Sequence, residues 1–301
     1  MPNLLDIRRR IRSVRNTRQI TRAMQMVSAA KLRRAQDQAF AARPYAERLS
    51  GLLMLVAGAE LDPSVAPMAA ALLARRPEQR VTLVVITADK GLAGAFNLNV
   101  FKAAQQAAAE RASARIEYEV VGRKARDYYR RRGRTISAET IGLFTRSVDH
   151  GVARDIAARL MRRYAAGETD AVYTIGNEFR SVFRQQVNVR RLLPIATEAV
   201  AQHKAAAAPA AAAPIEPIFE PAADAVLAAL LPRYVETQLY RSLLESFAAE
   251  QAARMNAMDT ATKNAADLID DLSLTMNRAR QAAITKEIIE VVSGAAAAQT
   301  G

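Results

Sequence analysis

Apolar residues recur with helical spacing at both ends of the chain, in two long runs that contain neither glycine nor proline. The first run covers residues 3–43, and the second covers residues 233–293. Both runs are rich in Ala, Arg, Met, Leu and Gln, which lose little freedom on entering a helix. At about 1.5 Å per residue, they predict helices of about 60 Å and about 90 Å. We therefore expect two long terminal helices with a globular part between them.

The second run carries one narrow stripe with alternating steps of four and three residues, the spacing of a left-handed coiled coil. The stripe consists of Met258, Thr262, Ala265, Ile269, Leu272, Met276, Ala279 and Ala283. The same register extends backwards through Met255, Gln251, Ala248 and Leu244. Many of these side chains are small, which suits the close approach of two helices.

The first run carries a similar stripe that begins regularly and then drifts. Its positions are, in order, Leu4, Ile7, Ile11, Val14, Ile20, Met24 and Val27, and it is interrupted at Thr17, Thr21 and Ser28. One stripe on each helix favours an antiparallel pair within a single chain, with pairing of each helix to another protein as the alternative.

Strand and helix patterns alternate between residues 80 and 195, which predicts a small Rossmann-like α/β domain. The β-branched run 81–86 indicates a buried parallel strand. Further strands are expected at 116–121, 171–175 and 181–193, and helices at 98–111, 123–132, 148–165 and 221–231. Pro44 begins the breaks after the first helix, and Pro232 opens the second long helix at a position where proline is tolerated.

The fold class is therefore α/β with long helices, and the chain divides into four segments. We expect an N-terminal coiled-coil helix over 1–60, an α/β domain over 75–200, an Ala/Pro-rich connection over 201–220, and a C-terminal helix over 221–301 that pairs with the first.

The net charge of +13 is unevenly distributed. Residues 1–43 hold eleven basic and two acidic residues, a net charge of +9, whereas residues 233–293 have a net charge of −2. The charge of the first helix therefore predicts an acidic partner.

Cysteine is absent and the two histidines are far apart, so we expect no disulfide, metal site or cofactor. No stretch approaches the roughly 20 apolar residues that span a bilayer. The Arg-rich opening could be taken for a transit peptide, but the helical pattern passes straight through it.

The loop at residues 87–97 joins a strand to a helix and contains Gly91 and Gly94, which makes it a candidate nucleotide site. It has neither G-x-G-x-x-G nor G-x-x-x-x-G-K-[ST]. We interpret it as a tight turn with structural Asp89 and Lys90. The rival hypothesis, a Rossmann-type nucleotide-binding enzyme, predicts specific nucleotide binding by residues 80–195.

Four segments together resemble the gamma subunits of rotary F-type ATP synthases, in their bacterial form. They are ITRAMQMVSAAKLRR at 20–34, TADKGLAGAFN at 87–97, ESFAAEQAARMNAM at 245–258 and RARQAAITKE at 278–287. The chloroplast form carries a regulatory cysteine pair, which this chain lacks. The resemblance extends from about residue 7 to residue 295.

The resemblance implies a central rotor shaft that catalyses nothing itself. One copy per complex would stand as an antiparallel coiled coil inside a hexamer of alpha and beta subunits, which carries the catalytic sites on beta. Its foot would meet the epsilon subunit and the c-ring, which ion flow turns. The complex would sit at the cytoplasmic face of the bacterial inner membrane, and this chain would be peripheral, without inserting into the bilayer.

The resemblance also implies which residues touch beta. The catch loops of beta would meet Arg254, Arg280, Gln281, Thr285 and Glu287. The acidic loop at the base of beta would pass Met24, Lys31, Arg33 and Arg34. The alternative from another class is a basic coiled-coil nucleic-acid-binding protein, which predicts a steep salt-dependent affinity for DNA. It has no use for the apolar end of the last helix at Ile284, Ile288, Ile289, Val291 and Val292.

Overall fold

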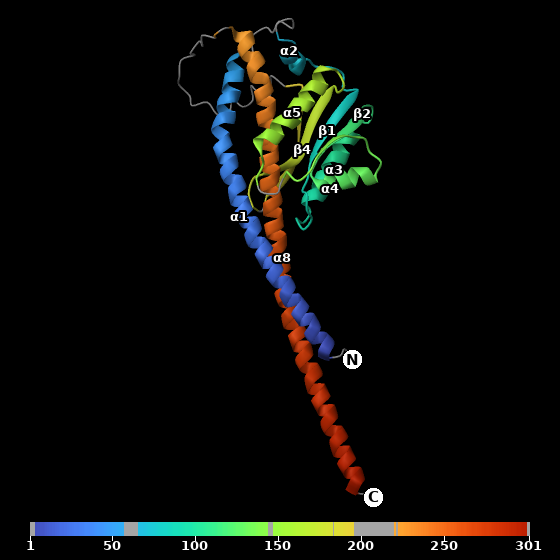
Figure 1. Cartoon of the computed structure of the whole chain (residues 1–301). Coiled ribbons are helices and arrows are strands. Elements are labelled where there is room, and N and C mark those ends of the chain that lie inside the picture. The colour runs from blue at the N-terminus through green and yellow to red at the C-terminus, as the bar shows by residue number, and fades with distance from the viewer. Residues whose placement is uncertain are drawn as a thin grey trace. The chain divides into compact units, whose positions relative to one another are not determined.

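The computed structural model describes residues 4–56, 66–143, 147–182, 184–195, 220 and 222–299. The predicted connection over 201–220 lies outside these residues except for Glu220. The chain divides into two compact units, Met1–Ser28 with Met255–Gly301, and Ala29–Arg254. Two helices contribute to both units, α1 (Leu4–Val56) and α8 (Ala223–Gln299), drawn in blue and in orange to red in Figure 1.

The first unit is an antiparallel pair formed by the beginning of α1 and the end of α8. Ile7 and Ile11 of α1 form a small core with Ile269 of α8. Farther along α1, the Thr21 and Thr262 hydroxyls lie 2.7 Å apart. Because later residues of α1 meet earlier residues of α8, the two helices run in opposite directions. This confirms the predicted intramolecular pairing within this unit.

The predicted drift of the first stripe is wrong. The side chains of Ile20 and Val27 are 60 % and 56 % exposed, whereas Thr21 and Ser28 are buried. Alternating steps of three and four residues from Ile11 lead to positions 14, 18, 21, 25 and 28. A regular coiled-coil register therefore places Thr21 and Ser28 on the side that faces the partner helix. The two threonine side chains fit there because each hydroxyl also has an acceptor on its own helix. Thr21 has the Arg18 carbonyl oxygen at 3.1 Å, and Thr262 has the Met258 carbonyl oxygen at 2.7 Å.

We expect the apolar and hydroxyl positions of this pair to respond differently to substitution. Ile11→Ala removes buried methyl groups and should lower the free energy of unfolding by about 2 kcal/mol or more. Thr21→Val combined with Thr262→Val removes both hydroxyls and keeps the side-chain shape, so the change should stay within about 1 kcal/mol. Urea unfolding followed by far-ultraviolet circular dichroism measures both. A double threonine variant less stable than Ile11→Ala would contradict this ranking.

The second unit contains a five-stranded sheet in the order β3-β2-β1-β4-β5. The strands are β1 (Arg80–Ile86), β2 (Arg115–Val121), β3 (Ile136–Thr140), β4 (Ala171–Phe179) and β5 (Gln185–Leu193). The first four are parallel, and β5 runs antiparallel to β4. The accompanying helices are α2 (Pro67–Leu73), α3 (Phe96–Ala109), α4 (Arg123–Arg131) and α5 (His150–Ala165). The mixed α/β class is confirmed.

Helices cover both faces of the sheet, as parallel strands require. Alternate side chains of β1 (Val81, Leu83 and Val85) share a core with residues of α3 and α4. Figure 1 shows the ribbons of these two helices beside the sheet. On the other face, the Arg159 guanidinium of α5 binds the fully buried Glu119 carboxylate. The second unit's part of α8 lies close to β4, where the Ser246 hydroxyl accepts a hydrogen bond from the Asn177 amide at 2.9 Å.

The sequence predicted that the first helix ends near Pro44 and that the second long helix begins at Pro232, and both predictions are wrong. Pro44 lies inside α1, and Pro232 lies inside α8, which begins at Ala223 rather than at the proline. Burial continues past each proline, at Leu49 and Leu53 in α1. In α8 the buried stripe runs through Leu227, Leu231, Val235, Leu239 and Leu243. Packing on both sides of a proline outweighs the one backbone hydrogen bond that it removes.

The sequence also failed to predict α2 and β3. The β3 segment offers a single large apolar residue, Ile136, because an edge strand with intermediate burial needs little hydrophobic periodicity. The other predicted strands and helices of this region are confirmed, with shifted ends. The residue limits of the four predicted segments stay a prediction.

Candidate partner-binding surfaces

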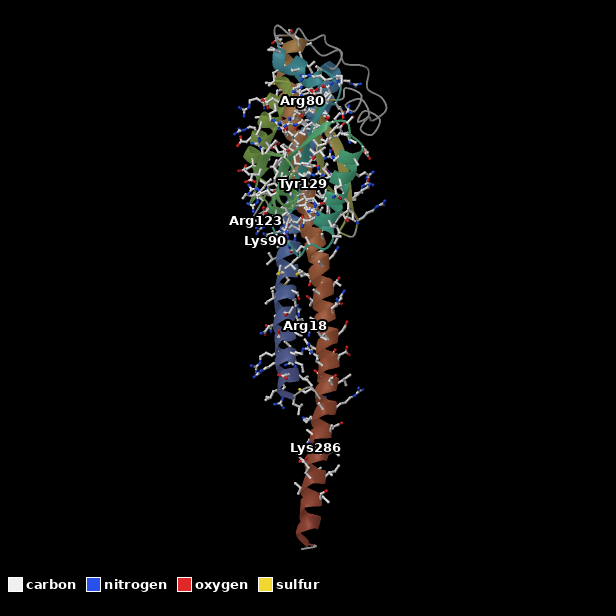
Figure 2. All side chains as sticks on the ribbon, turned by 90° about the vertical axis from the view of Figure 1, so that its right-hand side faces the viewer. Arg18, Arg80, Lys90, Arg123, Tyr129 and Lys286 are labelled. Atoms are coloured by element: carbon white, nitrogen blue, oxygen red, sulfur yellow. The ribbon has the colours of Figure 1, made fainter. Side chains whose placement is uncertain are left out.

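The carboxyl end of the parallel strands is where α/β folds usually bind ligands, and here the chain's own groups fill it. The Asp89 carboxylate oxygen Oδ1 accepts hydrogen bonds from the backbone amides of Arg123 and Gly142, both at 3.0 Å. The Thr87 hydroxyl accepts one from the Ala125 amide at 2.9 Å. These groups cap the amino end of α4, so Asp89 and Thr87 tie the loop after β1 to the helix that follows β2. Figure 2 labels Lys90, which follows Asp89 in the chain, and Arg123, whose amide binds Asp89. Asp89 is thereby confirmed as a structural residue.

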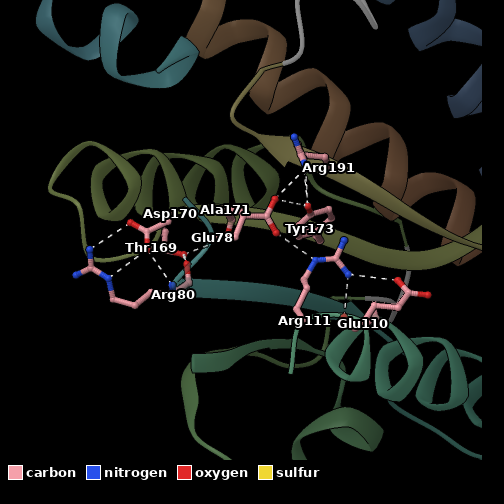
Figure 3. Close-up of polar contacts among 10 residues, drawn as sticks. Glu78, Arg80, Glu110, Arg111, Thr169, Asp170, Ala171, Tyr173 and Arg191 are labelled. Carbon is pink, nitrogen blue, oxygen red and sulfur yellow. Dashed lines mark hydrogen bonds and ion pairs between the residues drawn. The ribbon is translucent and has the colours of Figure 1, made fainter. Parts of the chain in front are cut away.

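The opposite end of the sheet holds a second polar network, drawn in Figure 3. The Tyr173 hydroxyl donates to the Glu78 carboxylate at 2.7 Å, and the Arg111 guanidinium lies 4.0 Å from the centre of the Tyr173 ring. Asp170 binds both the backbone amide and the guanidinium of Arg80. Burial acts to raise the pKa of Asp170, but the hydrogen bonds from Arg80 outweigh it, and the pKa is lowered. This network joins the amino ends of the strands to α3.

Arg254 differs from the other predicted contact residues because it is buried within the second unit. Its guanidinium lies 2.7 Å from the Glu250 carboxylate and donates a 3.2 Å hydrogen bond to the Gly91 carbonyl oxygen. It is 9 % exposed, and Glu250 is 2 % exposed. Burial raises the pKa of Glu250, and the attraction of Arg254 offsets this only in part. The structure thus gives Arg254 partners that link α8 to the loop after β1.

Glu250 was missed by the sequence reasoning. The signal that could have found it is the spacing of four residues between Glu250 and Arg254, which places opposite charges on one helix face. Lys31 lies in the same surroundings: burial and the Arg254 charge lower its pKa.

Four predicted contact residues lie on the exposed end of α8, namely Arg280, Gln281, Thr285 and Glu287. The Thr285 hydroxyl donates its hydrogen bond to the Gln281 carbonyl oxygen at 2.9 Å. Its oxygen can therefore still accept a hydrogen bond from a partner protein. Among and after them, the large apolar side chains of this helix are 48–71 % exposed, at Ile284, Ile288, Ile289, Val291 and Val292. Exposed apolar groups that adjoin charged ones are typical of an interaction surface.

On α1, the predicted contact residues are distributed over both units. Met24 in the first unit is half-buried, and Lys31 in the second unit is half-buried as well. Arg33 and Arg34 are exposed. The first unit's arginines are also exposed, and Arg18 and Lys286 are labelled on its two helices in Figure 2.

A groove of 360 Å³ lies within the second unit between α1 and α8. Aromatic side chains from α1, β4 and α8 line it, namely Phe40, Phe179 and Tyr240, together with the charged Arg43, Arg241 and Glu245. Phe40 is 60 % exposed. The sequence reasoning did not identify this surface, because its residues come from three distant parts of the chain.

No helix in the described part of the chain is long and apolar enough to cross a bilayer. The described residues also contain no group of three or more His, Asp and Glu side chains placed to hold a metal ion.

Comparison with known proteins gives consistent matches along the whole chain. The family model described as ATP synthase matches residues 3–298. A protein of Solibacter usitatus named ATP synthase gamma chain is 54 % identical, over 99 % of this chain and 100 % of that one. The ATP synthase gamma chain of Pelotomaculum thermopropionicum is 48 % identical, over 99 % of both chains.

Solved structures agree with this. The central stalk and c-ring structure of the Tetrahymena thermophila mitochondrial ATP synthase contains a chain with a TM-score of 0.56 and 26 % identity, covering 80 % of this chain and 99 % of that one. A chain of the Euglena gracilis mitochondrial ATP synthase has a TM-score of 0.67 at 17 % identity, over 99 % of this chain and 95 % of that one, which supports the fold alone. On the full-length matches, this chain belongs to the ATP synthase gamma chain family.

Proposed function

We propose that this chain is the central rotor shaft of an ATP synthase, which transmits rotation of the membrane c-ring to the catalytic beta subunits. The observation that carries the proposal is the pairing of α1 and α8 in the first unit, followed by an exposed charged and apolar end of α8. A supercoiled pair resists twisting better than one helix, as a shaft must. The chain itself is non-catalytic. Membership of the gamma chain family does not support the nucleic-acid-binding alternative.

The proposed mechanism uses contacts that form and break at defined angles. Arg280, Gln281, Thr285 and Glu287 are solvated, so their partners on the catch loops of beta can be exchanged as the shaft turns. Hydrogen bonds between ionised groups are strong and directional, which suits such positions. On α1, the exposed Arg33 and Arg34, with Met24 and Lys31, would face the acidic loop at the base of beta.

We place Arg254 outside this contact set. Its guanidinium is engaged by Glu250 and by the loop after β1. In this proposal the inward-facing guanidinium links α8 to the loop after β1 within the second unit and does not bind a partner. Its role is therefore positioning, and the other four α8 residues remain the proposed contacts.

The partners in this proposal are an alpha and beta hexamer, the epsilon subunit and the c-ring, with one copy of this chain per complex. The second unit would form the foot that meets epsilon and the ring, and the aromatic groove between α1 and α8 is the surface that we assign to these contacts. The location would be the cytoplasmic face of a bacterial inner membrane, where the chain is held peripherally by the complex.

We expect Arg280→Ala to lower ATP synthesis while the complex still assembles. Arg280 is exposed, so its loss does not disturb the packed core at Ile7, Ile11 and Ile269. A guanidinium binds a carboxylate with two parallel hydrogen bonds, which neither Ala nor Lys reproduces. The synthesis rate should fall about tenfold, which corresponds to a rise of about 1.4 kcal/mol in the activation free energy. The loss for Gln281→Ala should be smaller. The measurement is synthesis rate divided by the amount of complex on native gels.

Arg278→Ala is the matched control, because Arg278 is an exposed cation of the same helix outside the proposed contact set. Equal rates per complex for Arg280→Ala and Arg278→Ala would show that Arg280 is only solvated. Co-purification of this chain with alpha and beta subunits tests the wider proposal, and failure to co-purify would overturn it.

A further inference from the structure

The surface around α4 carries a positive charge that the rotor role does not use. Residues 123–134 contain six Arg and one Lys against a single acidic residue, a net charge of +6. The structure shows no ion pair for Arg131, Arg132 or Arg134 within the described residues, and all three are exposed. The Arg132 guanidinium stacks 3.6 Å from the centre of the Tyr128 ring, which holds it in place. The surface therefore combines a positioned guanidinium at Arg132 with the exposed cations of Arg131 and Arg134.

An open groove lies beside this array. It is lined by Arg130, Gly133 and Arg134 at the end of α4 and by residues 136–139 of β3. In the sheet, β3 is an edge strand with β2 as its neighbour on one side. An edge strand presents backbone N–H and C=O groups that a further strand can pair with.

One carboxylate of the chain already lies in the groove. Glu139 of β3 is 2.9 Å from the Arg130 guanidinium, and the side chains of both residues are partly exposed. This pair shows that an acidic side chain projecting from strand β3 reaches the arginines of α4. A carboxylate on an added strand beside β3 would meet the same array.

The chemistry of the groove favours a polypeptide over a membrane or a nucleic acid. Backbone groups of an edge strand are recognised by another extended backbone. None of the large apolar side chains that are exposed in the described residues lies between 123 and 140, so the surface offers nothing to insert into a bilayer. Arg binds carboxylates with two-pronged geometry.

We propose that the groove between α4 and β3 binds an extended acidic segment of another protein, which adds as a strand beside β3 and pairs its carboxylates with Arg130 and Arg134. This inference does not depend on the rotor role. The resident Glu139 competes with the incoming carboxylates, so the affinity is set by both charge and backbone pairing.

The test uses the full chain and a labelled ten-residue peptide of alternating Thr and Glu, with binding followed by fluorescence anisotropy. Arg130→Gln with Arg134→Gln should weaken binding by about tenfold, equivalent to about 1.4 kcal/mol. The control, Arg12→Gln with Arg15→Gln, changes the net charge equally on exposed positions of α1 and should stay within about twofold. Glu139→Gln should strengthen binding, because it removes the competing carboxylate.

Backbone pairing is tested separately. A peptide with the same charge but N-methyl groups at alternate residues should bind several-fold more weakly, and the unmethylated peptide should slow hydrogen exchange of the amides at 136–140. Equal binding of both peptides, or equal weakening by the two double substitutions, would overturn the proposal. Tighter binding to phosphatidylglycerol vesicles or to a DNA duplex of matched charge would overturn it as well, because charge alone would then decide.

Discussion

Replacing Arg254 with Met should lower the free energy of unfolding by about 3–5 kcal/mol, the usual cost of removing one partner of a buried ion pair. The reason is the Glu250 carboxylate, which is 2 % exposed and would lose the guanidinium 2.7 Å away. The substitution also removes the hydrogen bond to the Gly91 carbonyl oxygen and so loosens the loop after β1. Urea unfolding measures the stability, and hydrogen exchange of residues 87–97 reports on the loop.

The loss of stability caused by Arg254→Met should become smaller as the pH falls. Burial raises the pKa of Glu250 in the folded protein, so the folded state binds a proton more readily than the unfolded state. Stability contributed by a protonated group is present at low pH and is lost as pH rises through the folded-state pKa. Without Arg254 the pKa rises further, so the deficit of Arg254→Met should shrink on acidification from neutral pH towards the usual carboxyl range.

Two further variants make this prediction sharp. Arg278→Met removes an exposed cation from the same helix and should change stability by at most about 0.5 kcal/mol. Arg254→Met combined with Glu250→Met replaces both charges with apolar groups, so it should recover much of the loss. A double variant as unstable as Arg254→Met alone would show that the buried charge on Glu250 is not the cause.

Gly122→Ala should be the second severe change. Gly122 has φ +95°, a conformation that L side chains rarely adopt, and an added Cβ would lie 2.1 Å from the Thr87 carbonyl oxygen. The backbone there must move, which displaces the amino end of α4 from Thr87 and Asp89. Conformational strain alone costs about 1–3 kcal/mol, and the clash adds to it. Together, strain and clash should lower the free energy of unfolding by more than about 3 kcal/mol. Thermal or urea unfolding measures this loss.

Gly133→Ala separates the two causes. Gly133 also has positive φ, +62°, but an added Cβ meets nothing within 4 Å. Its cost should therefore be the strain alone, about 1 kcal/mol. Similar losses for the two variants would mean that the close approach of Gly122 to Thr87 is unimportant.

The exposure of a candidate contact residue was predictable where it follows from the residue's place on one helix. The resemblance in segment 278–287 identified Arg280, Gln281, Thr285 and Glu287, and the structure leaves all four exposed. Arg254 belongs to an equally specific segment, yet its guanidinium faces inward. Sequence similarity marks that residue as important, but it does not tell whether the side chain meets a partner or its own chain.

Several features followed from the sequence by itself, because they depend on local spacing. The apolar run 81–86 became the buried strand β1, and the stripe from Met258 to Ala279 became the paired side of α8. The loop at 87–97 was interpreted as a tight turn with a structural Asp89, and Asp89 accepts a hydrogen bond from the Arg123 amide at the start of α4.

Only the tertiary structure decided the rest, because these features depend on residues that are distant in sequence. Pro44 and Pro232 remain inside helices since the flanking turns are buried by packing. The groove beside β3 and the partners of Arg254 arise where loops, strands and helices from separate parts of the chain meet. Local periodicity specifies which face of an element is buried, whereas the contacts made by that face are specified by the other elements that cover it.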